Sequence, residues 1–442
     1  MLTQQDAKNL VDKVIGYSRL PACEVNVQWT EDAFIRFANN GITTSGYRVT
    51  QQVGITSITA DKRTGNTSVG ELSDEALKRG VEAAEALAAI SKPDPEAMPA
   101  LPAQEYPALH NFDTFTASAR GDVMIPHVRA LIDSASRNQL IAAGYIQRSS
   151  NAVAVANKAG LFGYHTYTDT GLSNTMRNQG GTSSGWASQS SASLKDLDGE
   201  TAARISSEKC LRGVGRKKLD PGKYTVVLEP AAVGDLVGWL GFAFGARDAE
   251  QGQSFLSKKG GGTLLGEKLY PEYITLRSDP FDPKMAATPW AQSLLPNEKI
   301  AWIDKGVVRN LNYDRFWASK AGKKPTPAAS NLVLDGQDHS LDDLIASVDR
   351  GLLITRLWYI RVVQPQTWQL TGLSRDGVFL IEKGKITDPV TNFRWNESPS
   401  EVLQRTTQLG RGERVTGGET GSQIVPPIVS TDFNFASVSD AV

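Results

Sequence analysis

Apolar positions along the first part of the chain follow two periods, one helical and one with the two-residue repeat of strands. Behind Thr3 and Asp6, which can cap a helix, apolar residues recur with helical spacing as far as Ile15. Alternation then predicts a strand around Val25 and a second strand that ends at Asn39-Asn40-Gly41, where an Asn-Gly pair favours a tight hairpin turn. Two further strands around 61–65 and a helix capped by Ser73 complete an expected α+β domain over residues 1–92.

A linker and a second domain are expected next. Five prolines lie between Pro93 and Pro107, which predicts an extended linker over 93–109. The central domain, 110–215, should begin with a helix at 123–137 and continue as strands on both sides of a hairpin loop at 157–160. It should end with a strand at 185–188 and a helix at 199–212.

The C-terminal domain, 216–442, is expected to be mostly β, with strands near 224–229, 299–304, 353–362 and 378–382. The predicted fold class is therefore α+β, with N-terminal and middle α/β segments followed by a mostly β C-terminal domain. A β-branched run before Pro230 predicts a buried strand, and the apolar residues 236–242 after it predict a helix.

Composition excludes several classes of function. A net charge of −1 over 442 residues gives no reason to expect nucleic acid or an anionic membrane as a partner. Two cysteines cannot form a disulfide framework, the N-terminus lacks the pattern of a signal peptide, and no apolar run reaches the ~20 residues needed to span a bilayer. A cytoplasmic protein is expected.

Four separate segments carry a resemblance to a known family. They are residues 34–41, 351–356, 371–377, and 380–386 followed by Pro389-Val390. Together with the strand and helix around Pro230, this set of segments resembles the TldD/PmbA family of metallopeptidase-related proteins over nearly the whole chain. In the zinc-bearing members the helix carries H-E-x-x-x-H, which provides two imidazole ligands and a carboxylate that activates metal-bound water.

The resemblance places the zinc motif where this chain has no metal-binding side chain. By register, Gly238 and Ala243 stand at the histidine positions and Trp239 stands at the glutamate position. Zinc-bearing members also supply a cysteine from a Gly-rich turn, which resembles the turn that begins at Gly417. None of these four residues can bind zinc or transfer a proton. This pattern resembles the TldE (PmbA) side of the family.

The resemblance implies a non-catalytic subunit. Such a chain would hold no cofactor, would pair with a TldD-like zinc-bearing paralogue as a heterodimer, and would help to degrade or process unfolded peptides. The alternative is a homodimeric peptidase or other hydrolase of the same family, with a site that the sequence does not identify. No Gly-x-Ser-x-Gly elbow supports a serine hydrolase.

The run that follows residues 351–356 contains candidate residues for a peptide channel. Alternation places Arg356 and Trp358 on one face of a strand, and Tyr359 and Arg361 on the other. One face could line a channel for an extended peptide, with an arginine that holds a carboxylate. The alternative is ordinary packing of the core and its rim. Arg375 is a further channel candidate, or it serves only to pair with its neighbour Asp376.

Two other segments favour structural interpretations. The Lys258-Lys259-Gly260-Gly261-Gly262 run lacks the residue order of a phosphate-binding loop, so a flexible turn is expected. The acidic cluster around His339 fits no known metal-ligand spacing, and Ser340 with Asp343 is typical of a helix cap.

Overall fold

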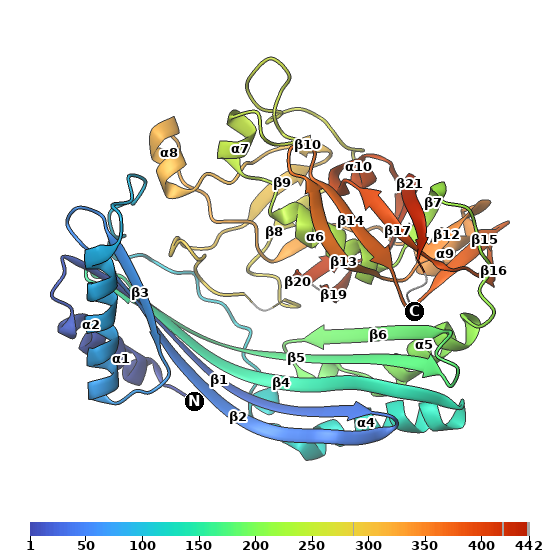
Figure 1. Cartoon of the computed structure of the whole chain (residues 1–442), viewed down its shortest axis with the longest axis horizontal. Coiled ribbons are helices and arrows are strands. Elements are labelled where there is room, and N and C mark those ends of the chain that lie inside the picture. The colour runs from blue at the N-terminus through green and yellow to red at the C-terminus, as the bar shows by residue number, and fades with distance from the viewer. Residues whose placement is uncertain (286, 418–419, 440–442) are drawn as a thin grey trace.

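Six antiparallel strands, four of them 17 or 18 residues long, form one curved sheet in the N-terminal half of the protein (Figure 1). The computed structural model describes residues 1–285, 287–417 and 420–439. The strands lie side by side in the order β3-β2-β1-β4-β5-β6. In chain order they are β1 (Ala22–Ala38), β2 (Gly41–Ile58), β3 (Thr64–Val69), β4 (Leu140–Asn157), β5 (Phe162–Asn178) and β6 (Ser184–Ser191). The segments expected as a first and a central domain therefore contribute strands to the same sheet.

The N-terminal hairpin differs from the expected one in two respects. Residues 22–38 form one continuous strand and not two, because no glycine or proline interrupts the extended backbone between Val25 and Phe37. The turn places positive φ angles at Asn39 (51°) and Asn40 (59°), while Gly41 already pairs with Ala38. The tight turn is confirmed, with the two asparagines and not Asn-Gly at its centre.

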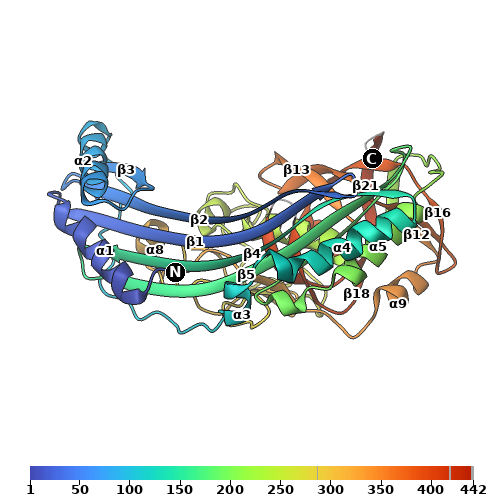
Figure 2. The same cartoon turned by 90° about the horizontal axis from the view of Figure 1, so that it is seen from below.

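Helices cover one face of this sheet, here called the outer face, which carries Val25, Ile35 and Phe37 (Figure 2). They are α1 (Gln4–Tyr17), α2 (Asp74–Ile90), α3 (Thr114–Ser118), α4 (Gly121–Arg137), the 3₁₀ turn η1 (Leu194–Asp196) and α5 (Gly199–Arg212). The predicted capping box of Thr3 and Asp6 and the cap at Ser73 are confirmed. The opposite face, here called the inner face, carries Arg36 and the residues paired with it.

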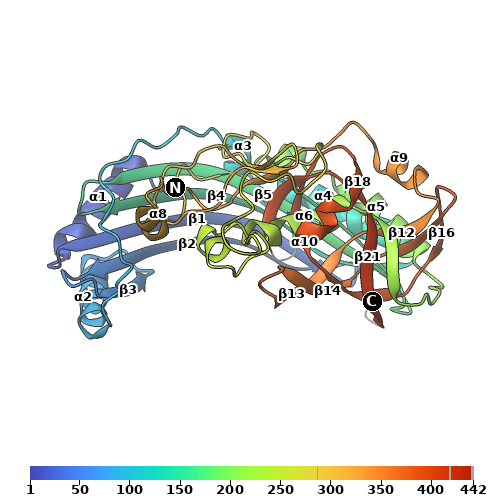
Figure 3. The ribbon, with the colours of Figure 1, turned by 90° about the horizontal axis from the view of Figure 1, so that it is seen from above.

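The C-terminal region packs two further sheets against its helices and lies over one end of the inner face (Figures 1 and 3). The larger sheet has the order β13-β14-β17-β21-β7-β12-β15-β16, with β18 paired to β21. Its strands are β7 (Gly222–Leu228), β12 (Arg350–Ile354), β13 (Leu357–Gln364), β14 (Gln369–Ser374), β15 (Val378–Glu382), β16 (Lys385–Pro389), β17 (Asn392–Glu397), β18 (Thr406–Leu409) and β21 (Ile428–Ser439).

The smaller sheet has the order β10-β9-β8-β11-β20-β19. Its strands are β8 (Leu276–Ser278), β9 (Ile300–Asp304), β10 (Val307–Val308), β11 (Leu332–Leu334), β19 (Glu413–Gly417) and β20 (Gly421–Val425). The helices of this region are α6 (Pro230–Gly241), α7 (Ala246–Glu250), α8 (Arg315–Ala321), α9 (Leu341–Ala346) and α10 (Pro399–Gln404). The predicted α+β class with a mostly β C-terminal region is confirmed.

One predicted strand is wrong in detail. The run expected at 353–362 is split into β12 and β13, and Arg356 lies in the break between them.

The Pro-rich linker has no helix or regular strand, but two hydrogen bonds hold it against the protein. The Tyr106 hydroxyl donates to the carbonyl of Leu294 at 2.9 Å, and the Asn157 amide donates to the carbonyl of Leu101 at 2.8 Å. Among the described residues, no helix has both the length and the apolar character needed to cross a bilayer.

Candidate functional site

Helix α6 packs unusually closely against the β19–β20 hairpin. It follows the buried strand β7, and Pro230 opens it at a position where the missing N–H costs no hydrogen bond. A Cβ atom added at Gly234 would lie 2.6 Å from a methyl carbon of Val415, and one at Gly238 would lie 2.1 Å from the hydroxyl oxygen of Thr420. Because these glycines are four residues apart, they share one face of the helix, and that face touches the hairpin.

The two regions that the sequence assigned to the family's zinc site therefore meet in space. Gly238 on α6 faces Thr420 at the start of β20, and a Cβ atom there would also lie 2.9 Å from the amide nitrogen of Gln423. The side chain of Gln423 is buried and its amide donates to the carbonyl of Thr420 at 2.9 Å. A hydroxyl and a neutral amide are poor ligands for zinc, which takes nitrogen, thiolate or carboxylate donors. The donor set at this position does not fit the metal.

The second histidine position lies just beyond the helix. Helix α6 ends at Gly241, and Ala243 is buried in the loop that follows, with its N–H donating to the carbonyl of Leu240 at 2.9 Å. Gly417 is the last residue of β19 and pairs with Gly421, whereas the neighbouring turn positions 418–419 lie outside the described residues. Neither Ala243 nor Gly417 carries a side chain that could coordinate a metal.

Trp239 packs against the core of the C-terminal region but is only half-buried. Its ring meets that of Phe242 edge-on at 6.0 Å, and Phe242 itself is 67% exposed. The indole N–H of Trp368 donates to the carbonyl oxygen of Trp239 at 2.9 Å. Trp239 thus occupies the surface of α6 at the expected glutamate position, with an apolar ring in place of a carboxylate.

Three of the four channel candidates form one stack with Trp186 of β6. The guanidinium carbon of Arg356 lies 4.2 Å from the ring centre of Trp186 and 4.9 Å from that of Trp358. The guanidinium carbon of Arg375 lies 5.3 Å from the ring centre of Trp358. The order Trp186, Arg356, Trp358, Arg375 is therefore a ladder of alternating cations and aromatic rings, which is stabilised by cation–π attraction.

Arg361 has a different position. Its guanidinium carbon lies 4.6 Å from the ring centre of Tyr359, which is 53% exposed. Tyr359 has a positive φ of 54°, and the pairing of β13 with β14 shifts between Trp358 and Arg361. The strand is therefore irregular at this point, and Arg361 packs on Tyr359 outside the stack.

Asp376 joins the stack to the first sheet. The Arg356 guanidinium donates to this buried carboxylate at 3.1 Å, and the Ser184 hydroxyl of β6 donates to it at 2.8 Å. The Arg375 guanidinium is more distant, at 3.9 Å. Asp376 therefore pairs mainly with Arg356, and the contact links the N-terminal sheet to the C-terminal region.

A polar cavity of about 280 Å³ lies beside the stack, between the inner face and the β19–β20 hairpin. Arg356, Tyr145, Gln147, Trp186, Thr416 and Ser422 belong to its lining. A neighbouring cavity shares Asp169 and Ser422 with it. The described part of the inner face is therefore hollowed along strands β4 to β6 where the C-terminal region approaches.

An ion pair that sequence reasoning missed lines the neighbouring cavity. The buried guanidinium of Arg414 on β19 donates to the Asp169 carboxylate of β5 at 2.7 Å and to the carbonyl of Lys284 at 2.9 Å. Burial raises the pKa of Asp169, and Arg414 opposes that shift. The two residues are 245 positions apart, so no local sequence pattern indicated the contact.

The remaining sequence candidates are structural. Lys258 pairs with Glu267 at 2.8 Å on the surface, and Ser340 with Asp343 forms the predicted capping box of α9. The acidic cluster includes an exposed ion pair between Asp338 and Arg411. In the described ranges we find no cluster of three or more histidine, cysteine, aspartate or glutamate side chains suited to a metal ion.

Comparison with known proteins finds two matching family models. Residues 221–437 match the PmbA/TldA metallopeptidase C-terminal domain, and residues 23–88 match the PmbA/TldA metallopeptidase domain 1. A protein of Archaeoglobus fulgidus described as a metalloprotease is 24% identical over 222 residues, which cover 46% of this chain and 50% of that protein. The match thus spans about half the length of the curated relative.

Solved structures share the fold over almost the whole chain. TldE from Thermococcus kodakarensis has a TM-score of 0.85 at 20% identity, covering 97% of this chain and 99% of that one. A putative modulator of DNA gyrase from Bacteroides thetaiotaomicron has a TM-score of 0.83 at 22% identity, with 99% and 100% covered. A similarly described protein from Thermotoga maritima has a TM-score of 0.82 at 17% identity, with 97% and 100% covered. With two domain models matched and the fold shared throughout, the chain belongs to the TldD/PmbA family of metallopeptidase-type proteins.

Proposed function

We propose that this chain is a TldE-like, non-catalytic subunit that pairs with a TldD-like, zinc-bearing paralogue in the cytoplasm. The pair would cleave or process unfolded peptides, with the zinc and the catalytic carboxylate supplied by the paralogue. This chain would supply shape, peptide contacts and a surface for association.

The observation that carries the proposal is the contact between Gly238 and Thr420. The fold of the family brings α6 and the β19–β20 hairpin together. The groups that face each other there are the hydrogen atom of Gly238, the hydroxyl of Thr420 and the neutral amide of Gln423. A histidine at Gly238 would collide with Thr420, so the space for a metal ligand is closed, and the groups that face it are poor ligands for zinc. A fold that is retained while its metal site is closed supports a subunit whose partner performs the chemistry.

Support for a peptide channel comes from the cavity beside Arg356. Its wall combines hydroxyl and amide side chains with Tyr145 and Trp186, groups that can bind a peptide backbone and apolar side chains together. Among the described residues, Arg356 and Arg375 share one carboxylate, that of the buried Asp376. A negatively charged group of a peptide could be bound by this excess of positive charge.

Support for association comes from apolar residues that remain exposed. On β2 these are Ile42 (50%), Tyr47 (58%) and Val49 (46%). Strand β3 pairs only with residues 53–58 of β2, so the first part of β2 forms an open sheet edge in the described structure. An interface between two related folds would bury roughly 2,000 Å² or more if it is obligate.

The proposal is tested by purifying the chain alone and together with its zinc-bearing paralogue. Analytical ultracentrifugation should show a one-to-one complex, and elemental analysis should find zinc in the complex at the level of the paralogue alone. A chain that stays separate from the paralogue and holds stoichiometric zinc by itself would instead favour the homodimeric hydrolase.

A further inference from the structure

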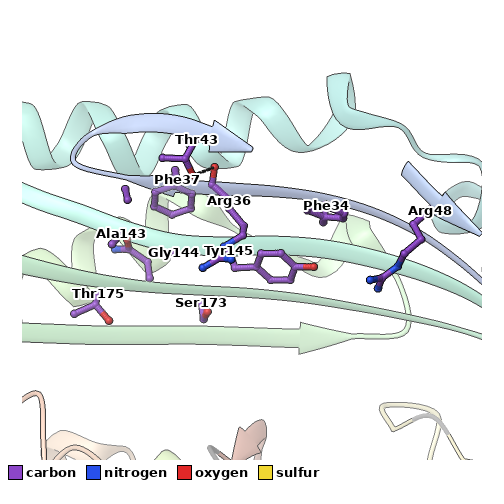
Figure 4. Close-up of a pocket in the computed structure, with 12 residues that line it drawn as sticks. Phe34, Arg36, Phe37, Thr43, Arg48, Ala143, Gly144, Tyr145, Ser173 and Thr175 are labelled. Atoms are coloured by element: carbon purple, nitrogen blue, oxygen red, sulfur yellow. Dashed lines mark hydrogen bonds between the residues drawn. The ribbon is translucent and has the colours of Figure 1, made fainter. Parts of the chain in front are cut away.

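A third cavity lies on the inner face, next to the cavity beside Arg356. It measures about 660 Å³ and is lined only by residues of β1, β2, β4 and β5 (Figure 4). Strand pairing places Arg36 beside Tyr145, Tyr145 beside Ser173, and Ser173 beside Ser188. Directly paired residues share a face of a sheet, so these four side chains form one row across the inner face.

The floor of this cavity is aromatic. The rings of Phe34 and Tyr145 stack with centres 5.8 Å apart and an angle of 29° between their planes. Phe34 lies over Gly46 of β2, where an added Cβ would stand 2.9 Å from the ring. The absence of a side chain at Gly46 therefore allows the Phe34 ring to lie flat against the sheet.

The two arginines of the cavity differ in their partners. Arg48 donates to the Asp32 carboxylate at 2.8 Å, which neutralises its charge. Arg36 is exposed, and within the described chain no carboxylate forms an ion pair with it. Figure 4 shows Arg36 and Tyr145 side by side in the cavity. The site thus offers one free guanidinium beside an aromatic platform.

This cavity adjoins the one at Arg356. Tyr145 and Ser173 line both, so the hollowed surface continues from β1 to the stack of Trp186 and Arg356. An extended peptide rises about 3.3 Å per residue, and a chain of several residues would be needed to follow such a path.

We propose that the cavity at Arg36 binds a carboxylate carried by an extended peptide. The planar guanidinium matches a carboxylate in bidentate geometry, and the Phe34–Tyr145 platform packs against the adjoining residue of the peptide. This inference deepens the proposed function, on which it rests, by naming the chemical group through which the non-catalytic subunit holds its substrate. The carboxylate belongs either to the C-terminus of the peptide or to an acidic side chain.

The test uses the full chain without the paralogue, so it does not depend on cleavage. Fluorescence anisotropy at low ionic strength measures binding of a labelled, disordered dodecapeptide that ends in Phe with a free C-terminal carboxylate. A second peptide has a C-terminal amide and no acidic residue, and a third has the amide and one internal Glu. The free acid, the Glu peptide, or both should bind about tenfold more tightly than the neutral peptide.

Arg36→Gln should remove that advantage and leave the neutral peptide unchanged. Arg137→Gln, an exposed change on α4 that covers the opposite face, should leave all three affinities unchanged. Ser173→Trp should fill the cavity and weaken all three peptides, with folding checked by thermal melting.

Equal affinity for the three peptides, or an unchanged preference in Arg36→Gln, would overturn the assignment of this site. Such a result would leave the proposed pairing with a zinc-bearing paralogue standing, because association and metal content are measured separately. Loss of pairing with the carboxylate preference intact would instead contradict the proposed function alone.

Discussion

Gly238 and Thr420 lie so close together that a Cβ atom at Gly238 would stand 2.1 Å from the Thr420 hydroxyl oxygen. The contact joins the two segments that supply zinc ligands in the metal-bearing members of the family. Because of this contact, only a residue without a side chain fits at position 238. The position that could have held a ligand is used here to bring α6 against the β19–β20 hairpin.

Gly238→Ala should therefore destabilise the fold. An added Cβ would lie only 2.1 Å from the Thr420 hydroxyl oxygen and 2.4 Å from its Cβ, so the overpacking should cost about 2–3 kcal/mol, the upper part of the usual range, while the better helix propensity of alanine returns about 1 kcal/mol. We expect a net loss of about 1–2 kcal/mol in chemical denaturation, and Thr420→Gly in the same chain should recover most of it. Gly16→Ala is the matched control, because this glycine of α1 has open space around it and should gain about 0.5–1 kcal/mol. A Gly238→Ala variant as stable as the unmodified chain would contradict the close packing.

Trp239→Ala should cost about 2 kcal/mol. The ring packs against the core but is half-buried, so the loss should fall below the ~3–5 kcal/mol expected for a fully buried tryptophan. Phe242→Ala, which removes an exposed ring, should cost less than about 1 kcal/mol. The comparison is made by urea denaturation of both variants. An equal cost for the two would mean that Trp239 is no more important to packing than its exposed neighbour.

Arg356→Gln should destabilise the protein by roughly 3 kcal/mol. The substitution leaves the Asp376 carboxylate buried with the Ser184 hydroxyl as its main remaining donor, and an unpaired buried charge is costly. Adding Asp376→Asn should recover part of the loss, because the buried group is then neutral. Arg375→Gln is the control, since its nitrogen lies 3.9 Å from the carboxylate and its side chain is more exposed. If Arg375→Gln proved the more damaging change, the assignment of the ion pair would be wrong.

The elements set by short-range rules were predictable from the sequence. Thr3 with Asp6 and Ser340 with Asp343 cap their helices as expected, because a capping box depends only on residues three apart. The position of the Gly238 helix after a buried strand was also correct. Its end was not: the family register extends the helix to Ala243, whereas it stops at Gly241, a residue type that often terminates helices.

Contacts between distant segments could not be predicted in the same way. The row of Arg36, Tyr145 and Ser173 depends on which strands are neighbours and in which register they pair. The Arg414–Asp169 ion pair depends on the position of the C-terminal region over the sheet. For the same reason the sequence showed Arg356, Trp358 and Arg375 as candidates but did not reveal that Trp186 completes their stack.

Protein stability should also depend on pH through His165. Burial lowers the pKa of this imidazole from 6.5 to about 4, and its Nε2 lies 2.9 Å from the Asn111 side-chain oxygen. The unfolded chain therefore takes up a proton at a higher pH than the folded protein does. The contribution of the neutral His165 side chain to the free energy of unfolding is fully present above pH 6.5 and is lost as the pH falls from 6.5 toward 4.

His165→Asn should make the free energy of unfolding fall less steeply over that range than in the unmodified chain. Denaturant titrations at a series of pH values give the two slopes. Identical slopes for His165→Asn and the unmodified chain would show that the imidazole is not held neutral.

The central claim, that this chain is a subunit without its own catalytic site, is tested most directly by peptide cleavage in a reconstituted pair. A disordered peptide is incubated with this chain, with the zinc-bearing paralogue, and with both, and products are followed by mass spectrometry with and without a metal chelator. The account predicts no cleavage by this chain alone, and chelator-sensitive cleavage by the pair that exceeds that of the paralogue by itself. Cleavage by this chain alone that a substitution within it abolishes would contradict the account and identify the chain as a hydrolase.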